Sequence, residues 1–414
     1  MFTRLSLKNI KSFDSAEIPL ANFTVLLGTN AAGKSNIRDT FRFLHGLSRG
    51  YKLIEVFAGK YEGGDQIWQG VRGGPYEFIT KEEPFGVIGV EFSESKSIYV
   101  LRVESMDSKP PRINAEVLSM EGNILYQIQD AAPNYTNIKI MAGGNFKKGQ
   151  VVTVLPDEAV LPQLADTQPY DGREDQGINL VKEGVRITTN YLRNMRFLDL
   201  SPDAMRESSY PGQNTLGDRG ENLSTVLQDL VENRGKGDAI IEWLRALTPM
   251  DVAGLRFDRD SRGRVSLTLM EHNKRATSAE SASDGTLRFL AYLALAFSVD
   301  TPTTCFIEEI DNGIHPSRLQ LLVELMETQS KQGKLQVIAT SHSPALLNLL
   351  SPESLGNAVL VYRTEGSRYS KVKPLKDIPN FSEIAERRHP GTLMESGWFE
   401  NTLEALEYVE EGAK

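Results

Sequence analysis

Polar and apolar residues alternate at the start of the chain and then give way to longer apolar runs. Residues 4–8 alternate with a period of two, which predicts a half-buried strand. Residues 23–27 are mainly apolar and end at Gly28, which predicts a second strand followed by a turn. Residues 35–47 carry apolar side chains at helical spacing. The chain is therefore expected to open with two strands, a glycine-rich turn and a helix.

The middle of the chain changes from a strand pattern to a helix pattern. Between residues 85 and 155, β-type runs are separated by Gly and Pro, which predicts an antiparallel meander. Residues 174–250 place apolar side chains in polar, helix-favouring surroundings. Heptads are not sustained there over several repeats, so no long coiled-coil arm is expected.

Strands and helices alternate in the last third of the chain. The pattern predicts strands over 264–270, 303–307 and 335–340, and helices over 286–297, 318–328 and 344–350. Such alternation is typical of an α/β fold. We expect four units: an N-terminal lobe with the meander at 1–160, a helical insertion at 161–255, a C-terminal lobe at 256–375 and a tail at 376–414.

Composition narrows the class of protein without identifying it. Of 414 residues, 40% are hydrophobic and 24% are charged, which is ordinary for a globular chain. The net charge of −9 opposes a wholly basic nucleic-acid-binding surface. The single cysteine, Cys305, excludes an intrachain disulfide and a cysteine-based metal cluster. The chain starts without a signal-peptide core, and its longest apolar run, Phe289–Phe297, is too short to span a bilayer, so a cytoplasmic location without membrane contact is expected.

A phosphate-binding pattern, G-x-x-x-x-G-K-[ST], covers residues 28–35. Its glycines let successive backbone N–H groups point into one concavity, and the following helix adds the positive end of its dipole. Lys34 would supply a charge to the β- and γ-phosphates, and the Ser35 hydroxyl would bind magnesium. The predicted nucleotide contacts are Gly28, Asn30, Ala31, Ala32, Gly33, Lys34, Ser35 and Asn36. The alternative, a glycine-rich turn that binds nothing, is opposed by the strand before the pattern and the helix after it.

Two acidic residues end the buried strand predicted at 303–307. Adjacent side chains on a strand point in opposite directions, so Glu308 and Glu309 should have different roles. We expect Glu308 to hold magnesium through water, and Glu309 to orient or deprotonate the attacking water. His342 follows the strand at 335–340, where it can donate to a γ-phosphate or polarise the water. The predicted catalytic residues are therefore Lys34, Glu309 and His342.

A second serine–glycine turn precedes the apolar helix at 286–297. Ser283, Asp284 and Gly285 can place an anion at the N-terminus of that helix. One γ-phosphate hardly needs two such sites from the same subunit. The turn is therefore expected to cap ATP held by a second subunit, through Ser283 and Gly285. The alternative is an ordinary capped core helix.

Together these four elements resemble the ABC ATPase heads of the RecF, RecN and SMC group. Residues 7–13 look like that group's N-terminal strand motif, which puts Lys11 on a basic position near the nucleotide. Residues 283–285 align with the signature turn, residues 308–309 with the Asp-Glu pair of the second acidic motif, and His342 with the switch histidine. The resemblance implies an α/β fold, an ABC ATPase head with a mixed central sheet, an antiparallel β subdomain and a helical insertion.

Further stretches resemble compact OLD-type ATPases. They are 311–316, which looks like a dimer-interface loop, and 197–202 with 220–223. Asp284 departs from the group by replacing the first glycine of the signature, and Gln66 is only a guess for the glutamine that links nucleotide to the helical lobe. About 40 residues follow position 375, too few for the nuclease domain that follows the ATPase in OLD proteins.

The resemblance implies an enzyme that hydrolyses ATP to ADP and phosphate with Mg²⁺ and dimerises around two ATP molecules. We expect a sensor or scaffold that works with a separate effector, such as a nuclease or toxin, in antiviral defence. The alternative is a RecF-like DNA-repair clamp that binds DNA. Candidate charges for a DNA-binding face are Lys147, Lys148, Arg193, Arg196, Arg387 and Arg388, each more simply a solvated surface residue. A transporter subunit is disfavoured, because the resemblance is to the RecF and OLD group and the chain has no predicted membrane span.

Overall fold

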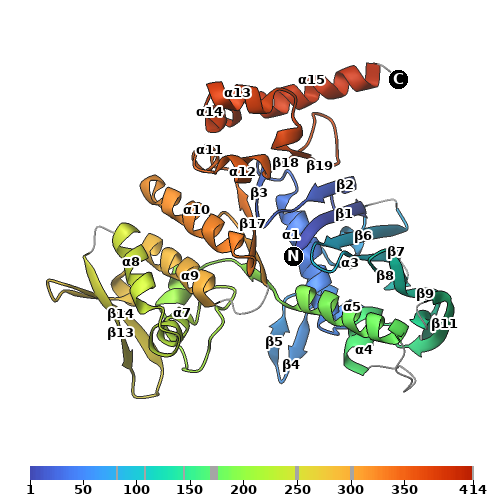
Figure 1. The fold of residues 1–414 in the computed structure, drawn as a ribbon, viewed down its shortest axis with the longest axis horizontal. Coiled ribbons are helices and arrows are strands. Elements are labelled where there is room, and N and C mark those ends of the chain that lie inside the picture. The colour runs from blue at the N-terminus through green and yellow to red at the C-terminus, as the bar shows by residue number, and fades with distance from the viewer. Residues whose placement is uncertain are drawn as a thin grey trace.

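The computed structural model describes residues 1–80, 83–106, 109–142, 145–167, 176–247, 251–298 and 303–412. Two large sheets organise the chain, and helix α1 (Lys34–Ser48) packs against both of them (Figure 1). One sheet is mainly parallel and carries the motif loops. The other is antiparallel and forms a separate layer.

The central sheet has six strands in the order β12–β16–β17–β3–β18–β19. They are β12 (Met195–Leu198), β16 (Thr303–Ile307), β17 (Leu335–Ser341), β3 (Phe23–Leu27), β18 (Val359–Tyr362) and β19 (Lys371–Pro374). The first five are parallel, and β19 pairs antiparallel with β18. Most of their side chains are buried, as expected for parallel strands covered on both faces. The carboxyl ends of β12, β16, β17 and β3 lie at one edge, where the motif residues follow.

The second sheet has eight antiparallel strands in the order β11–β10–β9–β8–β7–β6–β1–β2. The strands are β1 (Phe2–Ile10), β2 (Phe13–Pro19), β6 (Phe85–Phe92), β7 (Ser97–Met106), β8 (Lys109–Met120), β9 (Asn123–Ala132), β10 (Tyr135–Ala142) and β11 (Asn145–Val154). From β6 to β11, each strand pairs with the next in the chain, which confirms the predicted meander. β1 pairs with β6 and so attaches the meander to the start of the chain.

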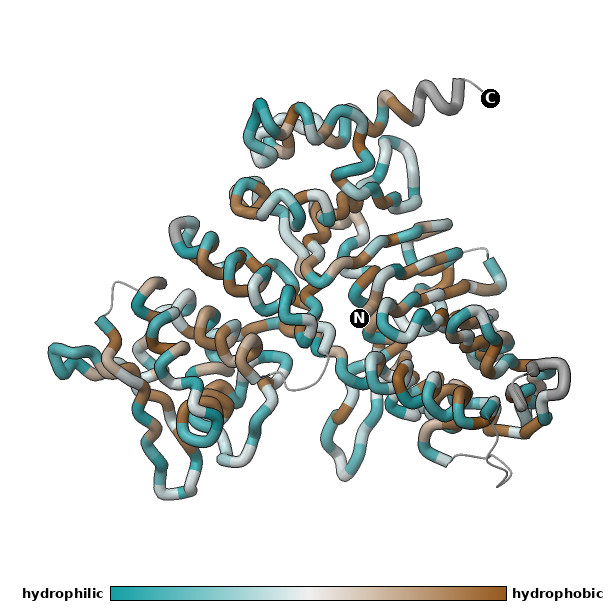
Figure 2. Tube along the Cα trace, viewed as in Figure 1, coloured by the Kyte–Doolittle hydropathy of each residue, from teal (hydrophilic) through white to brown (hydrophobic). Residues whose placement is uncertain are grey.

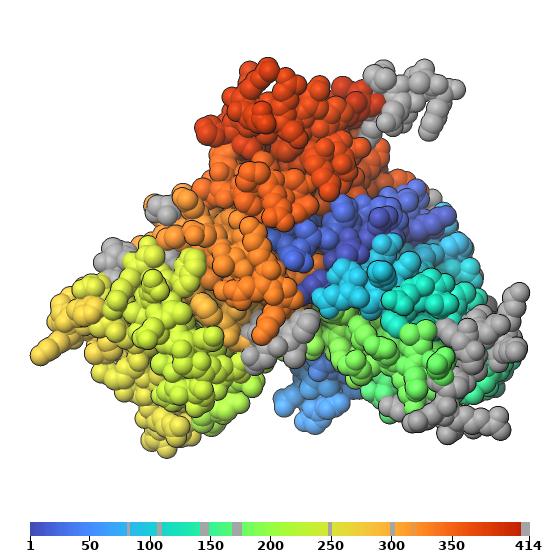
Figure 3. All heavy atoms as spheres, viewed as in Figure 1, coloured from blue at the N-terminus to red at the C-terminus, as the bar shows by residue number. Residues whose placement is uncertain are grey.

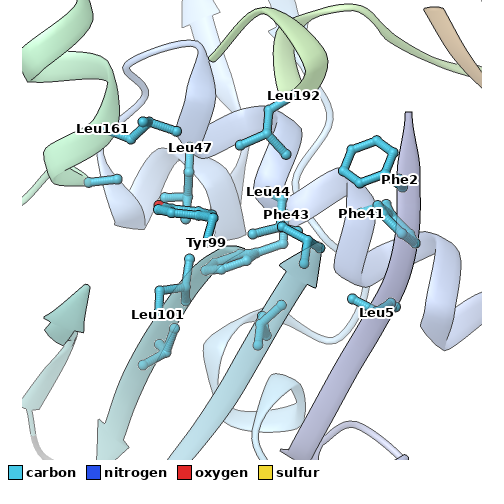
Figure 4. Close-up of a cluster of buried hydrophobic side chains, with 14 of the residues drawn as sticks. Phe2, Leu5, Phe41, Phe43, Leu44, Leu47, Tyr99, Leu101, Leu161 and Leu192 are labelled. Carbon is cyan, nitrogen blue, oxygen red and sulfur yellow. The ribbon is translucent and has the colours of Figure 1, made fainter. Parts of the chain in front are cut away.

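Helix α1 is at the centre of the first hydrophobic core (Figure 4). The ring of Phe41 lies 5.1 Å from that of Phe2 and 4.7 Å from that of Phe306, measured between centroids. Tyr99 and Leu101 reach the same cluster from β7 (Figure 4). Because Phe2 belongs to the antiparallel sheet and Phe306 to the central sheet, α1 holds the two sheets together.

Shorter elements complete this half of the molecule. They are α2 (Leu53–Ala58), the hairpin of β4 (Lys60–Glu62) and β5 (Asp65–Trp68), α3 (Gly74–Phe78), α4 (Val160–Thr167) and α5 (Gln176–Arg193). A buried carboxylate attaches α4 to β8, since Glu116 accepts hydrogen bonds from the N–H groups of Val160 and Leu161 at 2.8 and 2.9 Å. The hydroxyls of Tyr99 and Tyr126 also donate to Glu116, each at 2.9 Å.

The other half contains a lobe around α9 (Asp284–Ser298). The second hydrophobic core joins this lobe to the other face of the central sheet and to the C-terminal helices. The lobe contains α6 (Pro202–Arg206), α7 (Leu223–Gln228), η1 (Asp229–Asn233), α8 (Gly237–Leu247), η2 (Ala279–Ser281) and a sheet of β13 (Val252–Arg259), β14 (Val265–Glu271) and β15 (Ala276–Ser278). Helix α10 (Pro316–Lys331) contacts both this lobe and the central sheet. A notch separates the lobe from the β4–β5 hairpin (Figure 3). Hydrophobic residues gather inside, and the outer hairpin tips of the lobe are hydrophilic (Figure 2).

The C-terminal residues form a helical layer over one end of the central sheet (Figure 1). The elements are α11 (Pro344–Leu347), α12 (Pro352–Gly356), η3 (Leu375–Asp377), α13 (Phe381–Arg387), α14 (Pro390–Glu395) and α15 (Trp398–Gly412). Phe381, Leu393 and Phe399 attach the residues expected to be a tail to the second core. Within the described residues, the helices are all too short or too polar to cross a membrane.

The predicted α/β fold, with a mixed central sheet and an antiparallel β subdomain, is confirmed. The range 161–255, expected as one helical insertion, is divided among three places. Its helix α5 packs on the antiparallel sheet through residues such as Val181 and Val185, β12 joins the central sheet, and α6–α8 belong to the α9 lobe. Each segment goes where its apolar side chains are buried.

Candidate active site

The loop between β3 and α1 has the backbone geometry of a phosphate cradle. Gly28, Ala31 and Gly33 have φ angles of +142°, +65° and +120°. A Cβ atom at Gly28 would lie 2.1 Å from the carbonyl oxygen of Val361, so only glycine fits there. A Cβ atom at Gly33 would lie 2.6 Å from the hydroxyl oxygen of Ser370. The loop is therefore sharply curved and packs closely against Val361 and Ser370. A nest of N–H groups requires such a curved backbone.

Lys34 begins α1 and places its ammonium over this loop. Its Nζ donates hydrogen bonds to the carbonyl oxygens of Gly28 at 2.5 Å and Thr29 at 3.0 Å. Burial lowers the pKa of Lys34, and the Glu309 carboxylate opposes that shift. A phosphate would be a stronger partner for the ammonium than these neutral carbonyl groups, because charge-assisted hydrogen bonds are stronger. The loop thus presents a cation where a γ-phosphate is expected.

The loop forms one wall of a cleft of about 390 Å³, here called the phosphate cleft. Its lining combines the loop with the carboxyl ends of three strands and with α9. The lining residues are Thr29, Asn30, Ala31, Ala32, Gly33, Lys34, Ser35, Asn36, Arg72, Asp199, Arg288, Glu308, Glu309, Asn312 and Thr340. The structure therefore brings the predicted phosphate contacts from Asn30 to Asn36 together with both glutamates. Gly28 does not line the cleft, but its positive φ lets the chain turn at the start of the loop.

Glu308 follows β16 and faces two arginines. Its Oε1 lies 3.6 Å from Nη1 of Arg38 and 3.7 Å from Nη2 of Arg72. Mg²⁺ commonly takes one or two carboxylates, several waters and phosphate oxygens. Glu308 and the Ser35 hydroxyl line the same cleft, so this donor set fits a magnesium ion shared with a phosphate. Water and phosphate oxygens would complete its coordination.

Glu309 points to a different neighbour because the chain turns sharply after β16. Its φ of +48° is unusual for a residue other than glycine, and its N–H donates to the Thr340 hydroxyl at 2.9 Å. The Asn312 amide donates to Oε2 at 3.5 Å, and Nδ1 of His342 lies 3.9 Å from Oε1. The Glu309 side chain is 46% exposed and that of His342 is 52% exposed. The turn therefore pairs Glu309 with His342 where both can contact water.

Three charged residues of the phosphate cleft had no predicted role: Arg72, Asp199 and Arg288. Asp199 follows β12, which pairs in parallel with β16, so the two strands end side by side near Glu308. In the sequence, residues 197–202 stand out only for their resemblance to OLD-type ATPases. The pairing of this segment with a strand so distant in the sequence could not be predicted, so Asp199 had no assigned role.

Gln66 and Lys11 lie outside the phosphate cleft. Gln66, the guess for the linking glutamine, is an exposed residue of β5 and does not line the phosphate cleft. The Lys11 side chain is only 8% exposed, with Nζ 3.2 Å from Asp39 and 2.5 Å from the Arg72 carbonyl oxygen. Arg72 holds the other Asp39 oxygen at 3.2 Å. Lys11 thus fastens the β1–β2 turn to α1.

The Ser283 turn faces solvent in a separate cleft of about 320 Å³, here called the signature cleft. Ser283 Oγ accepts a hydrogen bond from the N–H of Thr286 at 3.3 Å and so caps α9. Asp284 forms an ion pair with Arg206 at 2.5 Å. A Cβ atom at Gly285 would lie 3.0 Å from the Gly313 carbonyl oxygen, so the turn packs against the loop at 311–316. That loop therefore separates the signature cleft from the phosphate cleft of the same chain.

The chain is similar in sequence to a domain family and to a bacterial protein. Residues 167–348 match the family described as "AAA domain, putative AbiEii toxin, Type IV TA system". The matched range contains the Ser283 turn, both glutamates and His342, and it begins after the phosphate loop. A Helicobacter pylori (strain ATCC 700392 / 26695) protein described as an ATP/GTP phosphatase is 21% identical over 386 residues, which cover 84% of this chain and 87% of that protein.

Solved structures of SMC heads also align with the chain. An Smc head bound to the C-terminal winged-helix domain of ScpA aligns with a TM-score of 0.49 and 14% identity, over 90% of this chain and 96% of that one. The SMC head domain from Thermotoga maritima aligns with a TM-score of 0.42 and 13% identity, over 90% and 98%.

The motifs, the sheet order and the family match agree with the class of protein inferred from the sequence. The chain has the fold and the motif residues expected of an ABC-type ATPase head, and its residues 167–348 match an AAA domain family. Within that class, the AAA-domain match is to the part of the chain that carries the Ser283 turn, the glutamates and the histidine.

Proposed function

We propose that the protein binds ATP and Mg²⁺ in the phosphate cleft and hydrolyses the ATP when the Ser283 turn of a second copy closes over the γ-phosphate. The separation of the two clefts on one chain carries this proposal. The phosphate cleft holds the lysine, the magnesium ligands and the candidate base. The signature cleft holds an exposed helix N-terminus with none of these groups.

The chemistry follows from the neighbours of Glu309. Lys34 and the loop N–H groups hold the β- and γ-phosphates, and Mg²⁺ bound by Ser35 and Glu308 would neutralise part of their charge. Glu309 orients a water molecule and takes its proton as the water oxygen attacks the γ-phosphorus. The bond between that phosphorus and the oxygen of the β-phosphate breaks, which yields ADP and inorganic phosphate. His342 lies 3.9 Å from Glu309 and would hold the water or a γ-phosphate oxygen.

The second copy supplies what the phosphate cleft lacks. A closed dimer makes both sets of phosphate contacts, whereas an open subunit makes only one, so ATP shifts the population towards the dimer. Hydrolysis removes the shared γ-phosphate and releases the turn. Two equivalent sites per dimer follow from a two-fold axis.

We place this ATPase in a sensor or scaffold role with a separate effector, such as a nuclease or toxin. The description of the matched family, which names a toxin and a toxin–antitoxin system, supports a role in defence. The DNA-clamp alternative has less support, because Arg193 pairs with Asp166 at 2.7 Å and Arg387 pairs with Glu383 at 2.8 Å. The side chains of Lys147 and Lys148 lie outside the described residues.

Glu309→Gln tests the catalytic assignment. The amide keeps the shape of the side chain but cannot take a proton, so ATP turnover should fall by about 10²–10⁴-fold while ATP binding persists. ATP-bound dimers should accumulate in size-exclusion chromatography with light scattering. Glu383→Gln, at an exposed position on α13, is the matched control. Turnover close to wild type in Glu309→Gln would remove Glu309 from the catalytic role.

A further inference from the structure

Arg38 contacts the proposed magnesium ligand Glu308 from outside the phosphate cleft. Its Nη1 lies 3.6 Å from Glu308 Oε1, and the two side chains are 12% and 25% exposed, so water and salt screen this ion pair only partly. Glu308 lines the phosphate cleft, whereas Arg38 does not. Arg38 therefore has no direct contact with an ion in the cleft and would act on it through Glu308.

The Arg38 guanidinium is held in place but has few polar partners. Its central carbon lies 5.9 Å from the centroid of the Phe197 ring, which stacks on Phe306 at 5.0 Å. The Arg38 Nε is buried and has no hydrogen-bond partner. Among the described residues, Glu308 is the one carboxylate within ion-pair distance of Arg38. Because a buried charge needs compensation, the two groups are firmly coupled.

A second arginine contacts the same carboxylate oxygen. Arg72 Nη2 lies 3.7 Å from Glu308 Oε1 and 3.2 Å from Asp39 Oδ1. The Arg72 side chain is 55% exposed, so solvent screens its charge more than that of Arg38. Asp39 also pairs with Lys11. Glu308 thus faces two cations, and Arg38 is the more buried of the two.

The charges around the phosphate cleft leave little attraction for a free divalent cation. Among the described residues, the charged side chains that line it are three cations and three carboxylates, namely Lys34, Arg72, Arg288, Asp199, Glu308 and Glu309. Arg38, next to Glu308, adds a further positive charge. A divalent cation at Glu308 Oε1 would be repelled by two guanidinium groups. The phosphate oxygens of a nucleotide bring the negative charge that offsets this repulsion.

We propose that Arg38 keeps the phosphate cleft from binding Mg²⁺ alone, so that the metal enters together with the phosphates of a nucleotide. The inference rests on the proposed function, because it takes Glu308 as a magnesium ligand. It makes Arg38 a positioning residue, for which no role was predicted from the sequence. A metal site that depends on the nucleotide makes closure of the dimer respond to the nucleotide and not to the concentration of free metal.

The test measures metal binding without nucleotide, which is independent of turnover. Mn²⁺, which prefers the same oxygen ligands as Mg²⁺, is titrated into the nucleotide-free protein and followed by electron paramagnetic resonance. Arg38→Gln should bind Mn²⁺ about tenfold more tightly than wild type, because one repelling charge is gone. Arg38→Met is a second neutral variant, and Arg38→Lys should stay close to wild type. Arg49→Gln, at the exposed arginine that ends α1, is the matched control.

A double variant shows whether the effect passes through Glu308. The gain in Mn²⁺ affinity on replacing Arg38 by Gln should disappear when Glu308 is also replaced by Gln, because the two side chains then no longer interact. A tenfold gain that survives in the Glu308→Gln background would overturn the proposal, since Arg38 would then act on another ligand.

The remaining outcomes separate this proposal from the proposed function. Binding of Mn²⁺ with ATP is measured in parallel and reports that each variant is folded. Unchanged or weaker binding of Mn²⁺ alone in both neutral variants, with Mn²⁺–ATP binding retained, would overturn the role of Arg38 and leave the ATPase proposal in place. If wild type failed to bind Mn²⁺ with ATP, the proposed function itself would fail.

Discussion

The N-termini of α1 and α9 contain similar residue types but differ in how enclosed they are. Both helices begin at a turn that contains glycine and a hydroxyl side chain. At α1 the turn is enclosed: Gly28 has no room for a Cβ atom, and Lys34 is held by two loop carbonyl oxygens. At α9 the turn is open, and Ser283 caps its own helix.

This contrast separates a complete binding site from half of one. The α1 turn has a lysine, a serine proposed to bind magnesium and two glutamates within one cleft. The α9 turn has backbone N–H groups, the hydroxyls of Ser283 and Thr286 and the Asp284–Arg206 pair, and its cleft is also lined by His315 and Arg318. A helix N-terminus attracts anions, but the lining of this cleft contains neither a lysine nor a glutamate. The α9 turn should therefore act on a phosphate that another site already holds.

The largest difference is expected between Lys34→Ala and Ser283→Arg. Both should reduce ATP turnover by about a thousandfold, because each removes a contact made to the γ-phosphate in the transition state. They should differ in binding: Lys34→Ala should lose ATP binding by the single subunit, whereas Ser283→Arg should keep it and lose ATP-dependent dimerisation. Calorimetry and light scattering measure the two properties. Ser281→Arg, at an exposed residue outside the signature cleft, is the matched control, and normal turnover in Ser283→Arg would contradict the role of the turn.

The two glycines should respond differently to an added methyl group. Gly28→Ala should cost about 3 kcal/mol of unfolding free energy and most ATP affinity, because the new Cβ would lie 2.1 Å from a backbone oxygen at φ +142°. Gly285→Ala should change stability by about 1 kcal/mol or less, since its nearest contact is 3.0 Å and alanine favours a helix. Thermal unfolding provides the comparison, with Gly254→Ala as control because no atom lies within 4 Å there. Equal losses at the two positions would show that the α1 turn is no more constrained than the α9 turn.

The far end of α1 should give the protein a pH-dependent stability. His45 is buried, and burial lowers its pKa from 6.5 to about 4 although Nδ1 lies 2.8 Å from the Leu192 carbonyl oxygen. The unfolded chain binds a proton that the folded chain does not, so stability is full above pH 6.5 and falls as the pH drops from 6.5 to 4. The loss from this residue should be about 3 kcal/mol. Denaturant unfolding across that range should show a flatter profile for His45→Asn and an unchanged one for His272→Asn, whose side chain is exposed.

The ion pairs of Asp39 on α1 and Asp284 on α9 should contribute unequally to the free energy of unfolding. Asp39 on α1 is 3% exposed and binds both Lys11 and Arg72, so Asp39→Asn should cost about 2 kcal/mol by leaving a buried ammonium poorly compensated. Asp284 is 62% exposed, and Asp284→Asn should cost less than about 1 kcal/mol. Urea midpoints of the two variants give the comparison. A larger loss at Asp284 would mean that the α9 turn is part of the rigid framework.

Local pattern was enough to predict the strands and turns of the site. The strand before Glu308 was predicted at the residues that form β16, and the strand before His342 within one residue of β17, because each is an apolar run with a clear end. The sheet order was not available from pattern, so the placement of Asp199 beside Glu308 could not be predicted. The Lys11–Asp39–Arg72 cluster was hidden for a similar reason, since it joins three segments through side chains. Helical periodicity in 161–255 likewise indicated apolar faces but not which surfaces would cover them.

Mixing two inactive variants tests the central claim most directly. Lys34→Ala and Ser283→Arg each lack one half of the site, but a mixed dimer contains one site with an intact Lys34 from one copy and an intact Ser283 from the other. An equimolar mixture should therefore recover ATP hydrolysis to about a quarter of the wild-type rate, since half the dimers are mixed and each has one working site. If the mixture stayed as inactive as its components, the lysine and the serine turn would not act on one nucleotide from two chains.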